Sequence, residues 1–475
     1  MTPGKRFDLI VVGAGPGGYK ACLRAVQLGM KVACVEKDPL PGGVCLNVGC
    51  IPSKALLDSS EYYQQMRTGF AEHGILADSV KLNLQAMMAR KERVVEGLGE
   101  NVRKLMESAG VECIRGAARL RGGNSIEVRS PASGSKSPAA AILEAGGILL
   151  ATGSEPIPLP VLPYDGMKVV DSTGALNFQT VPEHLVIVGG GAIGLELGSV
   201  WKRLGARVTV VEMMPVITAG LDGQVSRTLE RILTKQGFTF HLSAMVAGAA
   251  LSPGGVRVSI RQNGREEAIE CDRLLIAVGR RPFTRGLGVE SVGVELDSRT
   301  GHVLVDTRYR TSVPTIYAVG DLIAGPALAH KASAEGVAAV ECMAGISSEV
   351  NYDAIPSIVY TSPEAASVGW TEERLKERGI HYRAGICPLS GTARARCMGE
   401  TDGFVKVIAH AGTDRLLGAH IIAARASDMI SECVLAMELN APSEAIARAV
   451  HGHPTFSEAV REAAAAVRKR SGHTA

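Results

Sequence analysis

The sequence has few aromatic residues, little excess charge of either sign and few cysteines, and each shortage excludes a class of function. Aromatic residues make up 4% of the 475 residues, which argues against a stacking surface for single-stranded nucleic acid. The 51 Lys and Arg residues nearly balance the 48 Asp and Glu residues, so no basic footprint for nucleic acid is predicted. Ten cysteines are too few for a secreted disulfide scaffold and fit a reducing compartment.

Long apolar runs and a leader segment are also lacking. The first strand-like run, 8–12, begins too early for a signal or transit peptide. We therefore expect a cytoplasmic protein, with a processed mitochondrial matrix protein as the alternative. The most apolar long window, 185–200, carries Glu196 and five glycines, so no membrane span is expected, and no metal site is predicted. The length predicts two to four domains with small-molecule or protein partners.

Glycine is abundant, with 55 residues, and two glycine-rich segments occur in the same setting. Each follows a short apolar strand, precedes a helix-like run and a second strand, and ends on a glutamate. The first segment, 13–18, leads to Glu36, and the second, 189–194, leads to Glu212. In both, the first glycine stands 23 residues before the acid.

One such segment is a weak signal, but two matched copies predict two dinucleotide-binding folds. The first glycine makes a tight turn, the second lets the backbone approach a diphosphate, and the third lets the helix pack on the strand. The helix N-terminus then favours the anion. Glu212 is followed by methionines rather than arginines, so the second fold should prefer NAD to NADP. The glycines concerned are Gly13, Gly15 and Gly18 in the first copy and Gly189, Gly191 and Gly194 in the second.

Two cysteines five residues apart, Cys45 and Cys50, follow the first dinucleotide fold, with glycines before and between them. An arbitrary cysteine pair is more often two buried core residues. Beside a dinucleotide fold we interpret this pair as catalytic, and a helix beginning there would lower a thiol pKa. A thiol pair, one dinucleotide beside it and NAD on a second fold describe an electron relay, for which a flavin is needed. The other eight cysteines have no evident pairing pattern and are interpreted as core or surface residues.

His453 and Glu458 lie five residues apart near the C-terminus. An imidazole oriented by a carboxylate is a general base suited to deprotonating a thiol near neutral pH. Taken alone, such a segment is more often a solvated turn before a helix. The sequence by itself does not bring this segment near Cys45.

Four segments together resemble the flavin-dependent pyridine nucleotide-disulfide oxidoreductases, and among them the dihydrolipoamide dehydrogenases. They are 45–54, 189–212, 318–321 and 453–458, and they span nearly the whole chain in the family's order. The resemblance implies an α/β fold with two Rossmann-like dinucleotide-binding domains, for FAD and NAD, and a C-terminal α+β dimerisation domain. It also implies oxidation of protein-bound dihydrolipoamide to lipoamide with reduction of NAD to NADH.

The resemblance also implies roles for individual residues. Cys45 would exchange with the substrate sulfur, Cys50 would face the flavin, and the two would form the redox disulfide. His453, oriented by Glu458, would take the substrate thiol proton from across the interface of a homodimer. The further implied cofactor contacts are Glu36, Lys54 paired with Glu196, Ala118, Thr152, Gly153, Ser154, Asp321, Ala327, Leu328, Ala329 and His330 for FAD, and Glu212, Val246 and Gly279 for NAD.

Strand ends and composition predict four regions. Residues 1–150 would bind FAD and hold the thiol pair, 151–281 would bind NAD, 282–351 would complete the FAD site, and 352–475 would dimerise. The Ser/Pro/Gly-rich segment 130–138 is interpreted as a solvated excursion between two strands.

Three alternative functions stay open. Glutathione reductase is disfavoured by Glu212 without arginines and by Leu46 and Ser53 in the cysteine motif. Mercuric reductase carries a C-terminal cysteine pair, whereas the last cysteine here is Cys433. A flavin-binding scaffold or redox sensor would not need the intact cysteine and histidine motifs. The implied partners are the lipoyl-bearing acyltransferase cores of 2-oxo acid dehydrogenase complexes or the lipoyl carrier protein of glycine cleavage.

Overall fold

The computed structural model describes residues 5–130, 140–160, 163–252 and 254–468. The chain forms two compact units, and each is assembled from segments that are distant in the sequence. The first unit comprises Met1–Ala55, Met88–Ile157 and Gly279–Val350, and the second comprises Leu56–Met87, Pro158–Val278 and Asn351–Ala475. The boundaries of the four predicted regions stay a prediction.

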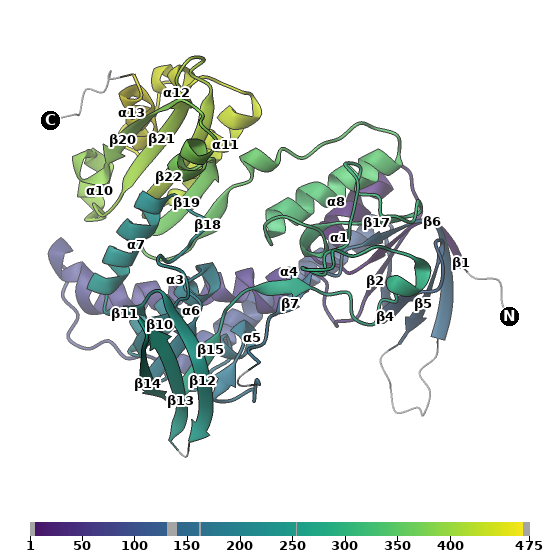
Figure 1. Cartoon of the computed structure of the whole chain (residues 1–475), viewed down its shortest axis with the longest axis horizontal. Coiled ribbons are helices and arrows are strands. Elements are labelled where there is room, and N and C mark those ends of the chain that lie inside the picture. The colour runs from purple at the N-terminus through teal and green to yellow at the C-terminus, as the bar shows by residue number, and fades with distance from the viewer. Residues whose placement is uncertain (1–4, 131–139, 161–162, 253, 469–475) are drawn as a thin grey trace. The chain divides into compact units, whose positions relative to one another are not determined.

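A seven-stranded sheet forms the core of the first unit (Figure 1). Its central strand, β1 (Lys5–Val12), pairs in parallel with β2 (Val32–Glu36) and β6 (Ala140–Leu150). The strands read as near-continuous apolar runs because both faces are covered, and Ile10 and Val11 are fully buried. The other strands of this unit are β3 (Glu112–Arg115), β4 (Ala117–Leu120), β5 (Ser125–Arg129), β17 (Ile316–Ala318), which joins β6 in parallel, and the short pair β7 (Ser154–Pro156) and β16 (Arg280–Pro282).

Helices α1 (Pro16–Gln27) and α8 (Ala329–Met343) lie side by side in the first unit (Figure 1). They approach closely because glycines face each other: a Cβ on Gly336 would meet the carbonyl of Gly17. This packing places the start of α1 beside the segment that contains β17. The other helical segments here are α2 (Gly43–Val48), the start of α3 (Cys50–Gln64), the main part of α4 (Leu84–Ser108), and the turns η3 (Glu290–Val292) and η4 (Gly320–Leu322).

The second unit contains a parallel five-stranded sheet in the order β11-β10-β9-β15-β8 and a separate antiparallel blade, β12-β13-β14. The parallel sheet repeats the strand–helix–strand arrangement of the first unit, with α6 between β9 and β10. The bounds are η1 (Gln65–Gly69), η2 (Phe70–His73), β8 (Val169–Val170), α5 (Ser172–Ala175), β9 (His184–Val188), α6 (Ala192–Leu204), β10 (Arg207–Val211), α7 (Gly223–Lys235), β11 (Phe238–His241), β12 (Ala244–Ser252), β13 (Gly255–Gln262), β14 (Arg265–Cys271) and β15 (Arg273–Ile276).

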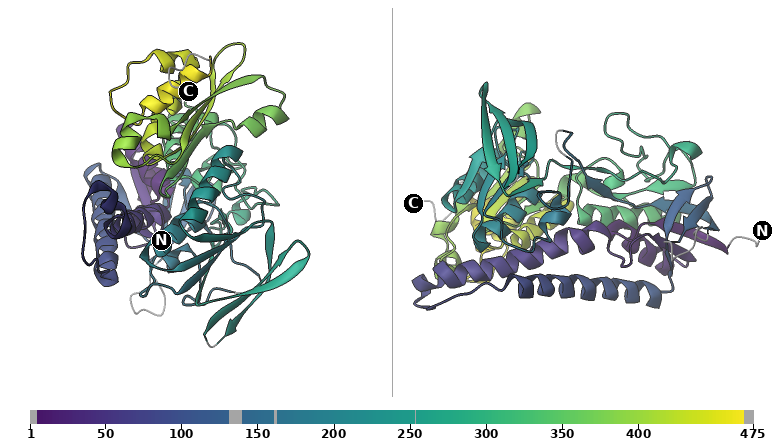
Figure 2. Two further views of the ribbon diagram at one scale, coloured as in Figure 1. Left: turned by 90° about the vertical axis from the view of Figure 1, so that its left-hand side faces the viewer. Right: turned by 90° about the horizontal axis from the view of Figure 1, so that it is seen from below.

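The C-terminal part of the second unit is an antiparallel five-stranded sheet, β18-β19-β22-β21-β20, with helices α11 and α13 packed on it (Figure 2). Its apolar core includes Phe456, buried in the turn before α13. The bounds are η5 (Tyr352–Ala354), β18 (Ser357–Val359), β19 (Glu364–Gly369), α9 (Glu372–Glu377), β20 (Tyr382–Pro388), η6 (Leu389–Gly391), α10 (Ala393–Met398), β21 (Phe404–His410), β22 (Leu416–Ala423), α11 (Ala426–Glu438), α12 (Ser443–Arg448) and α13 (Glu458–Ala466).

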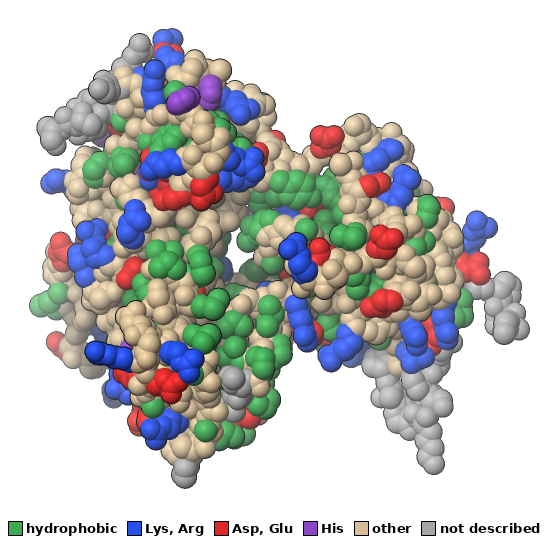
Figure 3. Space-filling view, viewed as in Figure 1, with side chains coloured by type: hydrophobic (Ala, Val, Ile, Leu, Met, Phe, Trp, Pro, Cys, Tyr) green, Lys and Arg blue, Asp and Glu red, His purple; other side chains and the backbone are tan. Residues whose placement is uncertain are grey.

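Two further features bear on the sequence expectations. Of the predicted excursion 130–138, all but Ser130 lies outside the described residues, and it falls between the antiparallel strands β5 and β6. On the face drawn in Figure 3, Lys and Arg side chains are interspersed with Asp and Glu. Within the described ranges, no helix is long and apolar enough to cross a membrane.

Candidate functional site

The two glycine-rich loops have matching geometry. The N–H of Gly13 donates to Val35 O at 2.8 Å, and that of Gly189 donates to Val211 O at 2.9 Å. Both glycines have positive φ, 100° and 110°, and in each case a Cβ would meet the carbonyl of a neighbouring strand end, Ala151 in the first loop. Only glycine fits such a position, so the first glycine of each motif is required by the backbone.

The second and third glycines of each loop differ in what surrounds them. A Cβ on Gly18 would meet Gly13 O, and one on Gly194 would meet Gly189 O, so helix and loop touch there. A Cβ on Gly191 would meet nothing within 4 Å, and one on Gly15 would reach only a Cα at 3.9 Å. These glycines precede α1 and α6, and neither helix has a side-chain cap. Open space and free helix N–H groups are the features that suit an anion at these positions.

The glutamates that end the two repeats make the same contacts. Glu36 accepts hydrogen bonds from the N–H of Ala14 at 2.7 Å and of Asp38 at 2.9 Å. Glu212 accepts from the N–H of Gly190 at 2.6 Å and of Met214 at 2.7 Å. Burial raises the pKa of Glu36, and these backbone hydrogen bonds oppose that rise. The carboxylates are thus fixed at the edge of each loop, where a ribose would lie.

The cysteine pair lies against the first glycine-rich loop. Gly42 N donates to Ala14 O at 2.7 Å, and Gly15 and Gly43 touch through their backbones. Cys45 lies in α2 and Cys50 begins α3, which places Cys50 at a helix N-terminus. The structure therefore brings both sulfurs beside the loop that would hold a dinucleotide.

The two thiols of this pair are hydrogen-bonded to each other. The S–H of Cys45 donates to Cys50, and this bond together with burial raises the pKa of Cys45 well above its ordinary value, although Lys54 opposes the rise. The sequence-based expectation that a helix N-terminus lowers the pKa of one thiol applies to Cys50, because α3 begins there, and it stays a prediction.

Residues predicted to contact a flavin gather at a hydrogen-bonded junction in the first unit. Ser154 Oγ donates to Asp321 Oδ2 at 2.5 Å, and Arg280 Nε donates to Ser154 Oγ at 2.7 Å. Thr152 Oγ1 donates to Phe283 O at 2.7 Å, while the carbonyl of Gly153 accepts from the N–H of Phe283 at 2.9 Å. Asp321 and the segment 152–154 are therefore held together across a long stretch of chain. Sequence reasoning did not single out Arg280.

A buried ion pair supports this junction, and the sequence analysis did not predict it. Lys331 and Glu335 on α8 lie 3.1 Å apart with no exposed side-chain surface. Lys331 Nζ donates to Gly320 O at 3.1 Å, and Glu335 Oε2 accepts from Gly320 N at 2.8 Å. The ion pair therefore holds the backbone of Gly320, the residue immediately before Asp321, through two hydrogen bonds. Its four-residue spacing was visible in the sequence, but that spacing usually indicates a surface pair.

The remaining predicted cofactor contacts occupy varied positions. Lys54 is half-buried on α3, and Glu196 is buried on α6, accepting from Tyr360 N at 3.1 Å. Ala118 is half-buried on β4 opposite Val128. Ala327 is exposed, Leu328 immediately precedes α8, and Ala329 and His330 are the first two residues of that helix. Val246 lies on β12. In the first unit, the carbonyl of Gly279 accepts a hydrogen bond from Ile157 N at 3.1 Å.

The histidine motif forms its predicted dyad. His453 Nδ1 lies 2.9 Å from Glu458 Oε1, while Glu458 Oε2 accepts from Thr455 N at 2.9 Å. The imidazole is 71% exposed. Burial opposes ionisation of Glu458, but these hydrogen bonds outweigh it and lower its pKa, so the carboxylate stays charged at neutral pH. Glu458 thereby fixes the proton on Nδ1 and leaves Nε2 to accept one. This dyad belongs to the second unit, and the cysteine pair belongs to the first.

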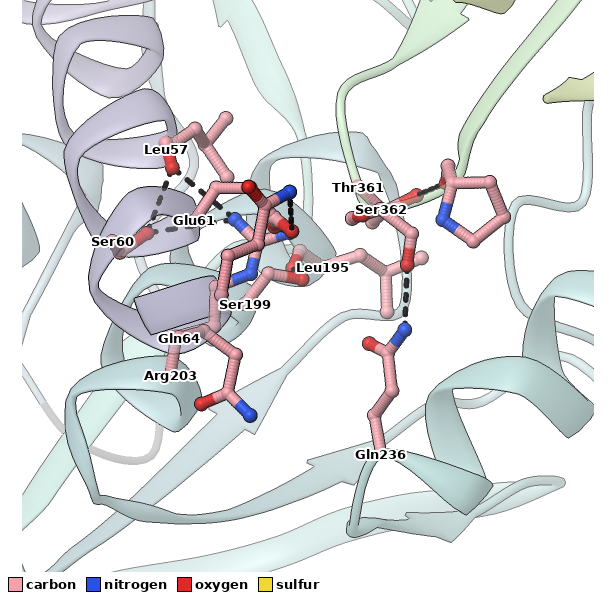
Figure 4. Close-up of polar contacts among 12 residues, drawn as sticks. Leu57, Ser60, Glu61, Gln64, Leu195, Ser199, Arg203, Gln236, Thr361 and Ser362 are labelled. Carbon is pink, nitrogen blue, oxygen red and sulfur yellow. Dashed lines mark hydrogen bonds and ion pairs between the residues drawn. The ribbon is translucent and has the colours of Figure 1, made fainter. Parts of the chain in front are cut away.

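A buried arginine links the later part of α3 to α6 (Figure 4). Arg203 pairs with Glu61 at 2.8 Å and donates to Leu57 O at 3.3 Å. Burial lowers the pKa of Arg203, against the attraction of Glu61. The helix that starts at Cys50 is thus anchored to the helix that starts at the second glycine-rich loop. Within the part of the chain that the structure describes, no group of three or more His, Cys, Asp or Glu could hold a metal ion.

Comparison with known proteins gives consistent matches. A dihydrolipoyl dehydrogenase, mitochondrial, from Sus scrofa is 48% identical over 461 residues, covering 96% of this chain and 89% of that protein. The Homo sapiens protein of the same name is 47% identical over the same extent. The crystal structure of LpdA from Mycobacterium tuberculosis superimposes with a TM-score of 0.88 at 27% identity, covering 97% of this chain and 99% of that chain.

A second solved structure, the HOCl-induced flavoprotein disulfide reductase RclA from Escherichia coli, gives a TM-score of 0.82 at 26% identity, over 96% of this chain and 99% of that chain. Residues 7–336 match the family model for pyridine nucleotide-disulphide oxidoreductase, and residues 355–464 match the model for the dimerisation domain of the same family. Together these matches cover most of the chain, including both glycine-rich loops, the cysteine pair and the histidine dyad. The protein belongs to the pyridine nucleotide-disulphide oxidoreductases.

Proposed function

We propose that this protein is a dihydrolipoyl dehydrogenase, which oxidises protein-bound dihydrolipoamide to lipoamide and reduces NAD to NADH. The observation that carries the proposal is the contact between the Cys45 and Cys50 thiols beside the first glycine-rich loop. The names of relatives that are 47–48% identical over 96% of the chain support the same activity.

The residues present fit FAD in the first unit and NAD in the second. Gly15 and Gly191 leave open space at uncapped helix N-termini, which suits a diphosphate in each unit. Glu36 and Glu212 are the proposed ribose ligands. Asp321, held by Ser154, is the proposed ligand of the flavin side chain. Bound FAD would accept two electrons from the thiol pair and hand a hydride to NAD.

The chain's own residues perform the thiol exchange and the proton transfer. With Cys45 and Cys50 joined as a disulfide, one substrate thiolate attacks the sulfur of Cys45 and releases the sulfur of Cys50. The second substrate thiolate then attacks the substrate sulfur of this mixed disulfide and releases Cys45, so the substrate leaves as a disulfide and both cysteines are reduced. The hydrogen bond to Cys50 and burial raise the pKa of Cys45, whereas Cys50 begins α3, where a helix N-terminus favours a thiolate. Cys50 is therefore the sulfur proposed to face the flavin.

His453 is the proposed general base, with Glu458 holding its tautomer. The exposed imidazole suits a site completed by a second chain, and we infer a homodimer in which His453 of the partner subunit serves the thiol pair. The match of residues 355–464 to a dimerisation domain supports this arrangement. The dimer would receive lipoyl groups from an acyltransferase core or a glycine cleavage carrier protein. A cytoplasmic or mitochondrial-matrix location stays a prediction, the relatives being called mitochondrial.

An anaerobic steady-state assay tests the proposal. Flavin-loaded protein is mixed with dihydrolipoamide and either NAD or NADP, and reduced nucleotide is followed by absorbance. We expect rapid NADH formation and a much slower reaction with NADP. No reduction of either nucleotide, or turnover only of glutathione disulfide with NADPH, would contradict the proposed substrate.

A further inference from the structure

Three cysteines outside the proposed relay lie together in the first unit. Cys22 is on α1, Cys34 is on β2, and Cys113 is on the neighbouring strand β3. Cys22 and Cys34 are 0% and 2% exposed, whereas Cys113 is exposed. The interpretation of these cysteines as core or surface residues is confirmed, and a helix face and a strand register bring them together in a way that the sequence did not show.

One strand register and one hydrogen bond link the three cysteines in a row. Cys34 and Cys113 are direct partners in the parallel register of β2 and β3, so their side chains project from the same face. Paired strands lie roughly 4.8 Å apart, which falls within the Cα separation of about 4.4–6.8 Å that a disulfide requires. Cys34 in turn is hydrogen-bonded to Cys22, which α1 presents to the sheet from its buried face.

We propose that Cys113, Cys34 and Cys22 form a peroxide-responsive thiol site, in which oxidation enters at the exposed Cys113 and ends as a Cys22–Cys34 disulfide. Cys113 is the entry point because it is the one member of the row open to solvent. The disulfide would tie α1 to β2, the two elements that carry the first glycine-rich loop and Glu36.

The reaction balances with hydrogen peroxide as the oxidant. Cys113 attacks the peroxide O–O bond, giving a sulfenic acid and one water. The sulfur of Cys34 displaces hydroxide from Cys113, which leaves as a second water with the thiol proton, and the Cys34–Cys113 bond forms. Cys22 then attacks Cys34, breaking that bond and returning Cys113 to a thiol. In sum, two thiols lose two electrons and two protons, and one peroxide becomes two waters.

The environment of the row makes the response depend on pH. Burial raises the pKa of Cys113 to about 11, and the hydrogen bond with Cys22 followed by burial raises that of Cys34. The thiolate is the reactive form, so the rate of oxidation should increase as the pH rises toward the pKa of Cys113.

Tryptic mapping of the whole flavin-loaded protein tests the proposal. The three cysteines fall on three different tryptic peptides, 21–24, 32–37 and 105–115, while Cys45 and Cys50 share peptide 38–54. Reduced protein, freed of reductant, is exposed to hydrogen peroxide, free thiols are blocked with N-ethylmaleimide, and peptides are separated without reduction. We expect peptide 21–24 joined to 32–37.

Cysteine variants test whether oxidation passes from Cys113 through Cys34 to Cys22. Cys113→Ser should slow formation of this link by about 10-fold or more, whereas Cys397→Ser, which removes another exposed cysteine, should leave the rate unchanged. In Cys22→Ala the product should become peptide 32–37 joined to 105–115. Failure of any joined peptide to form, or an unchanged rate in Cys113→Ser, would overturn the proposal.

Discussion

At the residue scale, we propose that the carboxylate of Glu212 selects NAD over NADP in the second unit. Glu212 and Glu36 occupy equivalent positions and make equivalent hydrogen bonds to loop N–H groups, yet only Glu212 is proposed to face NAD. The carboxylate of Glu212 would accept hydrogen bonds from a ribose and repel a 2′-phosphate. The two residues therefore form a natural pair for substitution.

Glu212→Ala should raise the KM for NAD by about 10-fold, since a hydrogen bond to a charged group is lost. The NADP-to-NAD ratio of kcat/KM should increase at the same time. Steady-state kinetics with both nucleotides measure this change. Glu36→Ala is the matched control and should weaken flavin retention while the nucleotide preference stays the same; unaltered preference in Glu212→Ala would remove that residue from its role.

His453→Gln should lower turnover by about 100-fold or more, because the amide cannot accept a proton from the substrate thiol. The reaction of dihydrolipoamide with NAD measures this loss. His410→Gln, at the end of β21 in the same C-terminal sheet, should turn over normally. Wild-type kinetics in His453→Gln would refute the assignment of the general base.

At the scale of elements, different glycines of one glycine-rich loop are expected to serve folding and nucleotide binding. Gly194 packs against Gly189 O, whereas a Cβ on Gly191 would enter open space before α6. Gly194→Ala should therefore lower the free energy of unfolding by about 1–3 kcal/mol. Gly191→Ala should leave folding intact and weaken NADH binding, because the methyl group occupies the diphosphate position. Urea unfolding and NADH titration distinguish the two, and equal effects on both would contradict the loop geometry.

The anchor between α3 and α6 yields a stability prediction. Arg203→Met leaves the half-buried Glu61 without its buried cation, which should lower the free energy of unfolding by about 3 kcal/mol. The double variant Arg203→Met/Glu61→Leu removes both charges and should recover most of that loss. Urea denaturation of the single and double variants gives the comparison, and additive losses would argue against a coupled pair.

Sequence patterns predicted the features that depend on local structure. Both strand–glycine–helix repeats were readable because their residues are close along the chain and each glycine has a backbone reason. Three tertiary contacts were not predicted from the sequence: the buried Lys331–Glu335 ion pair, the hydrogen bond from Arg280 to Ser154, and the Cys22–Cys34 hydrogen bond. They depend on which helix face meets which strand, and on long-range register. The raised pKa of Cys45 was not predicted because it follows from the hydrogen bond to Cys50 and from burial, which depend on how the chain folds around the pair.

At the scale of the whole molecule, the proposed activity needs residues from both units. The thiol pair belongs to the first unit, whereas Glu212 and the histidine dyad belong to the second. Segments distant in the sequence build each unit, so neither is a contiguous fragment that could be tested alone. The intact dimer is therefore the object for kinetic measurement.

The most direct test of the account is the rate of anaerobic NADH formation from dihydrolipoamide and NAD by single cysteine variants of the flavin-loaded protein. Cys45→Ser and Cys50→Ser should each lower the rate by about 1,000-fold or more, since each removes half of the exchanging pair. Cys113→Ser, which leaves that pair intact, should react at the wild-type rate. Retention of wild-type activity in either Cys45→Ser or Cys50→Ser would contradict the proposal that electrons pass through this pair.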